Sequence, residues 1–219
     1  MQIRTRELFE LDTPYLTDLF DEEYPWQIIP KIGNAINELL KSEPRGFTYY
    51  KSDVIIGKNV KISPLATVIG PAIIGSDTEI RTGAYIRGNV IIGRKCVIGN
   101  SSELKNCVLL NNVQVPHYNY IGDSILGNNS HMGAGSVLSN LKSDHKCVII
   151  HADGDFETGL RKLGSFLGDG ADIGCGCVLS PGTVIGRGTR VYPLTSVRGV
   201  IPHGCIVKSA KEIVAIEER

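Results

Sequence analysis

Aliphatic residues recur at every sixth position over most of the chain. The first run continues without a miss through ten positions, from Ile56 to Leu110. The same spacing returns in two further runs: Tyr120, Leu126, Met132 and Leu138, and then Leu167, Ile173, Leu179, Ile185, Val191 and Val197. Neither the 3.6-residue period of a helix nor the two-residue period of a strand produces a strict six. Such a hexapeptide repeat predicts a parallel β-helix whose stacked coils enclose the aliphatic side chains.

The repeat also divides the chain into parts. Residues 1–50 lack it and show apolar residues at helical spacing after Thr13-Pro14, so we expect short amphipathic helices that cap one end of the β-helix. Residues 51–210 form the repeat domain, and residues 211–219 form a C-terminal tail. The stretch from about 139 to 164 interrupts the repeat with charged and turn residues, which predicts a projecting loop.

The overall charge excludes some classes of partner. The 219 residues contain 23 Lys+Arg and 23 Asp+Glu, for a formal net charge of zero at pH 7, which disfavours binding to nucleic acid or to a membrane surface. The sequence shows no apolar run of about 18 residues and no apolar signal-peptide core, so we expect a cytoplasmic protein. The six cysteines form no C-x-x-C pair, and we interpret them as small core or wall residues.

Cationic residues replace the usual glycine at three corners of the repeat: Arg81, Arg87 and Lys105. Arg87 and Lys105 are 18 residues apart, so they stack at the strand spacing of about 4.8 Å if three hexads make one coil. Two adjacent cations repel each other unless an anion such as a phosphate bridges them. Alternatively, both long side chains extend into water, and the spacing alone does not separate these readings.

The repeat loses its frame between Leu110 and Tyr120, around Pro116 and His117. Local departures from an otherwise regular pattern are expected at functional sites. His117 is a candidate general base, because an imidazole can accept a proton from an attacking amine. Glu103 is a candidate carboxylate to orient it. The alternative is that His117 is a solvated turn residue.

Several motifs together resemble a known family. They are Arg81-Thr-Gly-Ala, Gly99-Asn-Ser-Ser-Glu-Leu-Lys105, His117-Tyr-Asn-Tyr120-Ile-Gly-Asp, and Met132-Gly-Ala-Gly135 followed by Asn140. Their order and spacing resemble the acetyltransferase domain of the bifunctional UDP-N-acetylglucosamine pyrophosphorylase/glucosamine-1-phosphate N-acetyltransferases, the archaeal-type members especially. The resemblance covers roughly residues 50–210 and implies an all-β, left-handed parallel β-helix with a short α-helical N-terminal segment.

The resemblance also implies roles for single residues. His117 would deprotonate the amine and Glu103 would support it. Arg81 and Lys105 would bind the sugar phosphate. The other substrate-binding positions implied are Tyr120, Asn140, His131 and Lys146, the last reaching the site of a neighbouring subunit. Ala134, Cys175 and Lys208 would contact acetyl-CoA, the cosubstrate, and no metal is expected.

The implied function is N-acetylation of an amino-sugar 1-phosphate, with glucosamine-1-phosphate as the expected acceptor, in nucleotide-sugar synthesis. The resemblance further implies a homotrimer with active sites between subunits. Two positions depart from the family: His131 replaces an asparagine and Leu141 a tyrosine, which leaves the acceptor sugar open. Fifty N-terminal residues give no room for a uridylyltransferase half, so we expect acetyl transfer only.

Two other functions fit the same repeat. A β-helix of this kind also serves as a non-catalytic regulatory or assembly partner of a separate sugar nucleotidyltransferase, although the joint presence of His117, Glu103 and Lys105 argues for catalysis. A γ-class carbonic anhydrase binds zinc through three histidines on this fold. The five histidines here lack the close pair and earlier partner that such a site needs.

Overall fold

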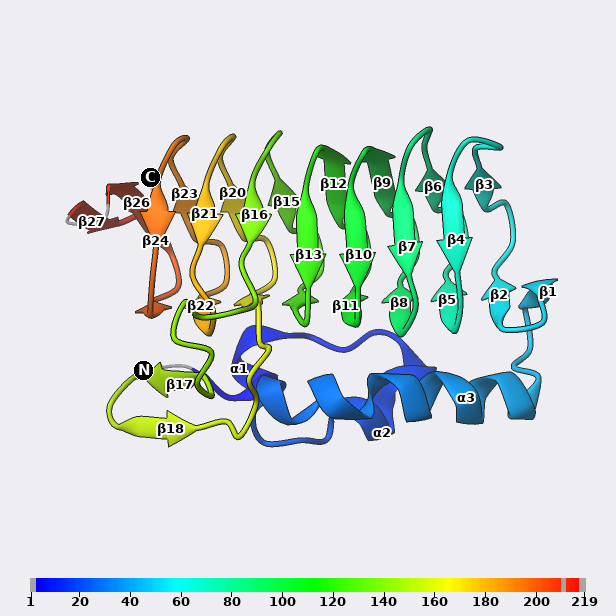
Figure 1. Ribbon diagram of the computed structural model, residues 1–219, viewed down its shortest axis with the longest axis horizontal. Coiled ribbons are helices and arrows are strands. Elements are labelled where there is room, and N and C mark those ends of the chain that lie inside the picture. Colours follow the sequence, from blue (N-terminus) through cyan, green and yellow to red (C-terminus); the bar gives the residue numbers. More distant parts are fainter. Residues whose placement is uncertain (1–2, 210–211, 217–219) are drawn as a thin grey trace.

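In the computed structural model, which describes residues 3–209 and 212–216, most of the chain forms three sheets wrapped around one axis (Figure 1). We number the sheets 1, 2 and 3 in the order in which the chain first meets them. The chain passes through one strand of each sheet in turn and then returns to sheet 1 one strand further along. In Figure 1 it climbs the rear sheet and descends the front sheet as the coils advance from right to left, which is a left-handed path. The predicted left-handed parallel β-helix is confirmed.

The strands are short, as a six-residue repeat requires. Sheet 1 contains, in spatial order, β1 (Thr48–Lys51), β2 (Val54–Ile56), β5 (Ala72–Ile74), β8 (Val90–Ile92), β11 (Cys107–Leu109), β14 (Ile125–Leu126), β19 (Ser165–Leu167), β22 (Thr183–Ile185) and β25 (Val200–Ile201). Sheet 2 contains β3 (Lys61–Ile62), β6 (Glu79–Ile80), β9 (Val97–Asn100), β12 (Gln114–His117), β15 (His131–Met132), β20 (Asp172–Ile173), β23 (Arg190–Val191), β26 (Cys205–Ser209) and β27 (Glu212–Ala215). Sheet 3 contains β4 (Thr67–Ile69), β7 (Tyr85–Arg87), β10 (Glu103–Lys105), β13 (Tyr120–Gly122), β16 (Val137–Leu138), β21 (Val178–Leu179) and β24 (Ser196–Val197).

Strand register gives the length of each coil. Ile74 pairs with Ile92, 18 residues later, so three hexads make one coil as predicted. The coil becomes one residue shorter at the turn after Lys105, because Ile92 pairs with Leu109 and Leu104 pairs with Ile121, each 17 residues later. The strict count of six therefore gave the wrong interior residue at two positions, since Leu109 and Ile121 fill the tube while Leu110 and Tyr120 face outward.

The N-terminal segment covers a side of the β-helix, not its end. Its helices are α1 (Thr5–Leu8), α2 (Thr17–Phe20), α3 (Ile32–Ser42) and 3₁₀ turns at Pro14–Leu16, Pro25–Gln27 and Ile29–Lys31. They pack on outward-facing aliphatic residues of sheet 1 that lie one coil apart: Ile55, Ile73, Ile91, Val108 and Ile125. Because these side chains form an apolar stripe along the axis, the helices run beneath the sheet (Figure 1), and the predicted end cap is wrong.

The interruption at residues 139–164 leaves the coil as predicted, but it folds back on the molecule. It contains a β-hairpin of β17 (Ile149–His151) and β18 (Asp155–Glu157). Phe156 of this hairpin lies against Tyr24 and Trp26 of the N-terminal segment, with ring centroids 5.3 and 5.9 Å apart. The segment is therefore anchored by apolar packing and is not a free loop.

The remaining sequence predictions on packing are mostly confirmed. Every aliphatic residue of the predicted run from Leu167 to Val197 lies in the interior of the tube. Four cysteines are buried, whereas Cys147 and Cys175 are exposed and so are not core residues. Within the predicted tail, residues 211 and 217–219 lie outside the described residues, and β27 pairs antiparallel with β26.

A buried tyrosine makes the stability of this fold depend on alkaline pH. The Tyr15 hydroxyl is buried without a hydrogen-bond partner among the described residues. Burial raises the pKa of Tyr15 to about 12, whereas an unfolded tyrosine titrates near about 10. The unfolded chain therefore releases the proton first. The contribution of Tyr15 to the free energy of unfolding is fully present below about pH 10. It falls by up to about 3 kcal/mol as the pH rises towards about 12.

Tyr15→Phe should remove this alkaline loss and raise Tm at neutral pH, because it removes an unpaired buried hydroxyl. Thermal melts across this pH range measure both effects. Tyr50→Phe is the matched control, because the Tyr50 side chain is exposed. A Tyr15→Phe protein that keeps the wild-type alkaline loss would contradict the assignment.

Candidate functional site

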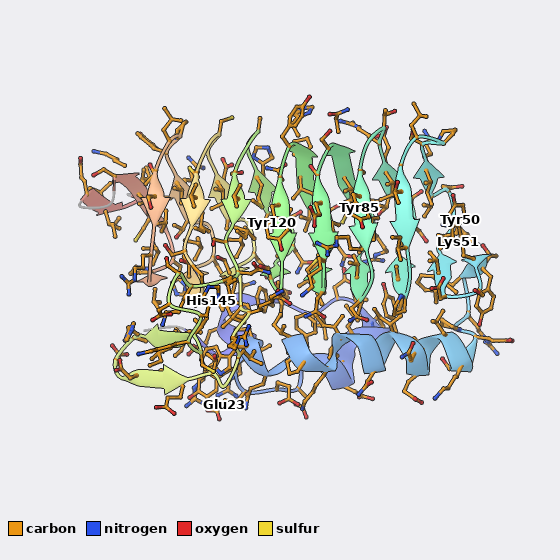
Figure 2. The ribbon with its side chains drawn as sticks, in the orientation of Figure 1. Glu23, Tyr50, Lys51, Tyr85, Tyr120 and His145 are labelled. Carbon is orange, nitrogen blue, oxygen red and sulfur yellow. The ribbon has the colours of Figure 1, made fainter. Side chains whose placement is uncertain are left out.

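The outer face of sheet 3 carries a group of polar side chains on adjacent strands. In β10 the side chain of Leu104 points into the tube, so Glu103 and Lys105 point outward. Glu103 lies in register with Tyr85 of β7 and Tyr120 of β13. Figure 2 shows both tyrosines on the same side of the β-helix. Strand stacking alone therefore places these side chains side by side.

Asp123 organises this group from the corner between sheets 3 and 1. Its carboxylate accepts hydrogen bonds from Lys105 Nζ (2.8 Å), Asn106 Nδ2 (2.8 Å) and Asn140 Nδ2 (2.6 Å). The Asp123 side chain is only 4% exposed, against 27% for Lys105. Asn140 Nδ2 also lies 3.1 Å from the Tyr120 hydroxyl oxygen. The buried carboxylate thus holds two predicted substrate-binding residues, Lys105 and Asn140, in fixed positions.

Tyr120 remains a neutral phenol in this setting. Burial and then the carboxylates of Asp123 and Glu103 raise the pKa of Tyr120, because each of these disfavours a negative phenolate. Its oxygen accepts a hydrogen bond from Asn140, so its own proton is available to a ligand. The side chain can therefore act as a hydrogen-bond donor at neutral and mildly alkaline pH.

Glu103 is bound by a different residue from the one predicted. Its Oε1 accepts a hydrogen bond from Arg87 Nη1 at 2.6 Å. Among the described residues no hydrogen bond joins Glu103 to His117. The two cations that stack on adjacent coils are therefore neutralised separately, Arg87 by Glu103 and Lys105 by Asp123. In the single chain each cation thus has its own carboxylate partner, which removes their mutual repulsion and leaves the bridging anion a prediction.

His117 lies at the corner between sheets 2 and 3. Its backbone amide donates to Asn119 Oδ1 (3.1 Å), and the buried Asn119 side chain donates in turn to the Gly133 carbonyl (2.8 Å). These bonds fix the corner and leave the His117 side chain exposed. The next two coils carry only small residues at this corner, around Ala134 and Cys175, so a shallow strip of exposed backbone extends from His117 along the axis.

The structure separates Arg81 from the residue with which it was expected to bind phosphate. Arg81 lies before β7 at the corner between sheets 2 and 3, and its guanidinium pairs with Glu79 (3.2 Å). Lys105 lies at the other end of the sheet 3 strands, beside Arg87. The single chain therefore does not place Arg81 next to Lys105, and a joint phosphate site of these two residues stays a prediction. Arg87 is the arginine next to Lys105.

Three other predicted residues lie apart from this group. His131 is on the outer face of sheet 2 and pairs with Asp172 (2.9 Å). Lys146 is exposed in the inserted segment, where its backbone amide lowers the pKa of the Asp144 carboxyl. Lys208 lies four strands from His117 in sheet 2, about 19 Å along the axis at 4.8 Å per strand, and pairs with Glu212. A single chain does not bring these side chains to Tyr120.

Sequence reasoning missed one residue that the structure places at the centre of the group, Asp123. Arg87 was already predicted from its 18-residue spacing to neighbour Lys105, with a bridging phosphate as one of two alternatives. Asp123 was part of a quoted motif but received no role. Its backbone has a positive φ of 50°, which a corner requires and aspartate tolerates, so the sequence offered only a turn interpretation.

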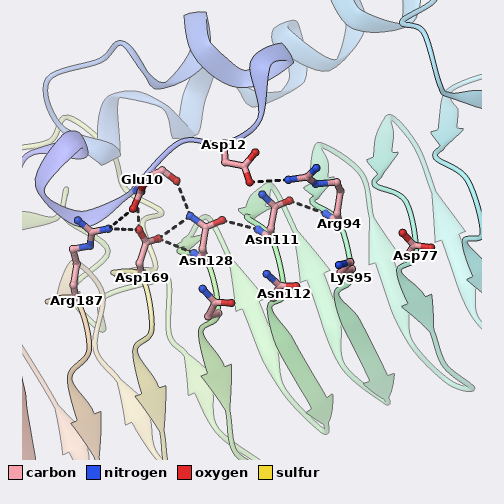
Figure 3. A pocket seen from close by; sticks show the side chains of 11 residues that line it. Glu10, Asp12, Asp77, Arg94, Lys95, Asn111, Asn112, Asn128, Asp169 and Arg187 are labelled. Carbon is pink, nitrogen blue, oxygen red and sulfur yellow. Dashed lines mark hydrogen bonds and ion pairs between the residues drawn. The ribbon is translucent and has the colours of Figure 1, made fainter.

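A second polar furrow, of about 540 Å³, runs along the corner between sheets 1 and 2 (Figure 3). Several of its side chains bind backbone amides or other side chains of the same furrow. Asn111 Oδ1 accepts from the Arg94 backbone amide (2.9 Å), and Asn128 Oδ1 accepts from that of Asn111 (3.0 Å). Asp169 pairs with Arg187 (2.8 Å). Because these groups already have partners that tie the N-terminal segment to the coils, we assign the furrow a structural role.

The chain is similar to several known proteins. A family model described as the GMPPB C-terminal domain matches residues 68–153. The "Bifunctional sugar-1-phosphate nucleotidylyltransferase/acetyltransferase" of Sulfurisphaera tokodaii is 33% identical, covering 82% of this chain and 46% of the relative. The predicted family resemblance is confirmed. "Bifunctional protein GlmU" of Methanococcus aeolicus is 32% identical, covering 89% of this chain and 48% of the relative.

The chain thus spans less than half the length of these two curated relatives. Among solved structures, a mutant of the N-acyltransferase AntD from Bacillus cereus, in complex with dTDP-4-amino-4,6-dideoxyglucose and coenzyme A, matches with a TM-score of 0.46. It is 18% identical, and the match covers 84% of this chain and 89% of that one.

Two features are absent from the described residues. Across residues 3–209 and 212–216, no group of three or more His, Cys, Asp and Glu side chains is placed to hold a metal ion. Within the same part of the chain no helix is long and apolar enough to cross a membrane.

Replacing the buried carboxylate should cost more stability than replacing an exposed one. Asp123→Asn keeps the turn geometry but removes the charge that neutralises Lys105 and turns an amide donor towards other donors. Breaking one side of a buried ion pair costs about 3–5 kcal/mol. Asp155→Asn, which breaks an exposed pair with His151, should cost less than about 1 kcal/mol. Chemical denaturation measures both, and equal losses would contradict the role assigned to Asp123.

Proposed function

We propose that this protein is an acetyl-CoA-dependent N-acetyltransferase that acts on an amino-sugar 1-phosphate, with glucosamine-1-phosphate as the expected acceptor. The observation that carries the proposal is the set of side chains on sheet 3, where Arg87, Lys105, Tyr120 and Asn140 lie on adjacent coils around Asp123. Cations at one end and hydroxyl and amide groups beside them suit a phosphorylated sugar. The names of the curated relatives support the same class of reaction.

In this proposal the phosphate binds at Arg87 and Lys105. A guanidinium has five N–H donors and an ammonium has three, so the bonds to Glu103 and Asp123 leave donors on both residues for phosphate oxygens. Tyr120 and Asn140 then face the sugar ring. Arg87 takes the role that the sequence comparison gave to Arg81, because only Arg87 lies beside Lys105.

The chemical step is direct transfer. The amine nitrogen attacks the thioester carbonyl of acetyl-CoA, a C–N bond forms and the C–S bond breaks, so coenzyme A leaves as the thiolate. His117 accepts the proton that the amine loses and passes it to the thiolate, which requires a neutral imidazole. No covalent enzyme intermediate is needed. Acetyl-CoA would lie along the strip of small residues near Ala134 and Cys175, with Lys208 further along the axis.

We also propose a homotrimer whose active sites include residues of two chains. His131 and Lys146 lie on surfaces away from Tyr120 in one chain, so a neighbouring copy must supply them if they bind the acceptor. Sheet 3 and the corner between sheets 2 and 3 also expose large apolar side chains: Leu65, Ile69, Tyr85, Tyr118, Val178 and Leu194. Light scattering should give three times the 23.8 kDa of one chain, and a stable monomer at micromolar concentration would contradict the proposal.

One observation favours a second candidate, a non-catalytic β-helix that assists a separate sugar nucleotidyltransferase. In the single chain Glu103 is hydrogen-bonded to Arg87 and not to the proposed base. An assay of coenzyme A thiol release with acetyl-CoA and a panel of amino-sugar 1-phosphates separates the two. For an acetyltransferase, the rate of coenzyme A release should rise when the correct acceptor sugar is added. If the rate with every sugar equals the rate without acceptor, the non-catalytic role is favoured.

His117→Ala should lower kcat by roughly 10²–10⁴ with little change in stability, because the side chain is exposed and outside the aliphatic interior. Glu103→Gln should cause a smaller loss. His151→Ala, an exposed histidine of the hairpin, is the control for folding and should retain full activity. An unchanged kcat in folded His117→Ala protein would remove His117 as the base.

The two arginines should differ clearly in their effect on acceptor binding. Arg87→Ala removes a charge-assisted contact with phosphate worth about 1.5–3 kcal/mol, so the acceptor KM should rise about 10- to 150-fold while the acetyl-CoA KM stays nearly constant. Arg81→Ala, a change of the same chemistry at the other end of β7, should leave the acceptor KM within about twofold. Steady-state kinetics of both variants test this, and a larger effect at Arg81 would reverse the assignment.

A further inference from the structure

A groove of about 470 Å³ lies between the N-terminal helix α3 and the coils that carry the two cations. This volume falls in the range of small-molecule sites. One wall is made by Gly33, Asn34 and Asn37 of α3. The other wall is made by the corner between sheets 3 and 1, with Arg87, Gly88, Asn89, Lys105 and Asn106. The groove thus opens onto the side chains to which we assign the acceptor phosphate.

Packing of α3 on the β-helix places two asparagines beside this groove. Asn34 and Asn37 are three residues apart and so lie on the same face of α3. A Cβ atom on Gly33 would lie 2.7 Å from Asn89 Oδ1, so the helix approaches the corner closely here and a larger residue would displace the Asn89 side chain. The helix also contacts β8, the strand after that corner. Both asparagines are exposed and line the groove.

The carboxamides of this groove differ from two of those that line the furrow between sheets 1 and 2. Asn111 and Asn128 in that furrow are bound to backbone and side-chain partners. In contrast, the side chains of Asn34, Asn37 and Asn89 make no hydrogen bond to any described residue. The groove therefore presents unused amide donors next to two cations, and only Asn106 is already bound, to Asp123.

We propose that Asn34 and Asn37 bind the phosphate end of the acceptor together with Arg87 and Lys105. This inference rests on the proposed function, because it concerns the acceptor of that reaction. Arg87 and Lys105 are each neutralised in part by a carboxylate, so neutral N–H donors from the helix add hydrogen bonds to phosphate oxygens. The N-terminal segment is then part of the acceptor site as well as the cover of sheet 1.

Two ligands share this chemistry: an amino-sugar 1-phosphate and a nucleoside-diphosphate amino sugar. Calorimetric titration of both into the wild type and the Asn34→Ala/Asn37→Ala double variant separates them. We expect the double variant to bind one of the two at least about tenfold more weakly and to bind acetyl-CoA unchanged. Loss confined to the 1-phosphate identifies the monoester as the ligand of the groove, and loss confined to the nucleotide sugar identifies the diphosphate.

Glu38→Ala is the matched control, because it changes an exposed residue of the same helix and should leave both affinities unchanged. Alanine favours the helix more than asparagine does, so the double variant should fold, which a thermal melt checks. Equal affinities of wild type and double variant for both phosphorylated ligands would overturn the inference, as would the absence of binding to the wild type. Calorimetry measures binding without turnover. If the double variant binds a phosphorylated ligand more weakly but the wild type shows no acetyltransferase activity, the proposed function alone is refuted and the inference stands.

Discussion

In-register stacking of coils on the aliphatic interior is the constraint on which the rest of this structure depends. Each inward residue, such as Ile86 or Leu104, sits directly above its counterpart in the next coil. An outward residue must then lie one strand spacing, about 4.8 Å, from the residue one coil away. Glu103 meets Tyr120 and Arg87 meets Lys105 for this reason. The polar group on sheet 3 is therefore a consequence of the tube.

The same constraint explains why the corners carry the remaining chemistry. A corner residue is outside the tube and is free to be polar, as Asp123 and His117 are, provided that its backbone conformation suits the turn. Where a corner carboxylate is buried, it needs several donors, and Asp123 has three. Where a corner is only a turn, as along the furrow between sheets 1 and 2, the amides bind each other and the N-terminal segment. The corner at Asp123 and the corner between sheets 1 and 2 are both rich in Asn and Asp, but we assign a ligand only to the first.

The sequence predicted the β-helix and most of its interior, because a six-residue period has one structural solution. It failed where the period changed by one residue, so Leu110 and Tyr120 were assigned inward. The position of the helices was also wrong, although Ile73 and Ile91, one coil apart and outward-facing, indicated an apolar side on sheet 1. Which arginine lies beside Lys105, Arg81 or Arg87, depends on the corner that each one occupies. A comparison of motifs does not show the corner, because it does not include the geometry of the coil.

We assign the outer face of sheet 3 and the adjoining corner to a phosphorylated amino sugar. A crystal structure of the protein with glucosamine-1-phosphate bound tests this assignment most directly. We expect the phosphate within hydrogen-bond distance of both Arg87 and Lys105, with the sugar towards Tyr120 and Asn140. A phosphate bound instead at Arg81, or in the furrow lined by Arg94 and Arg187, would contradict it.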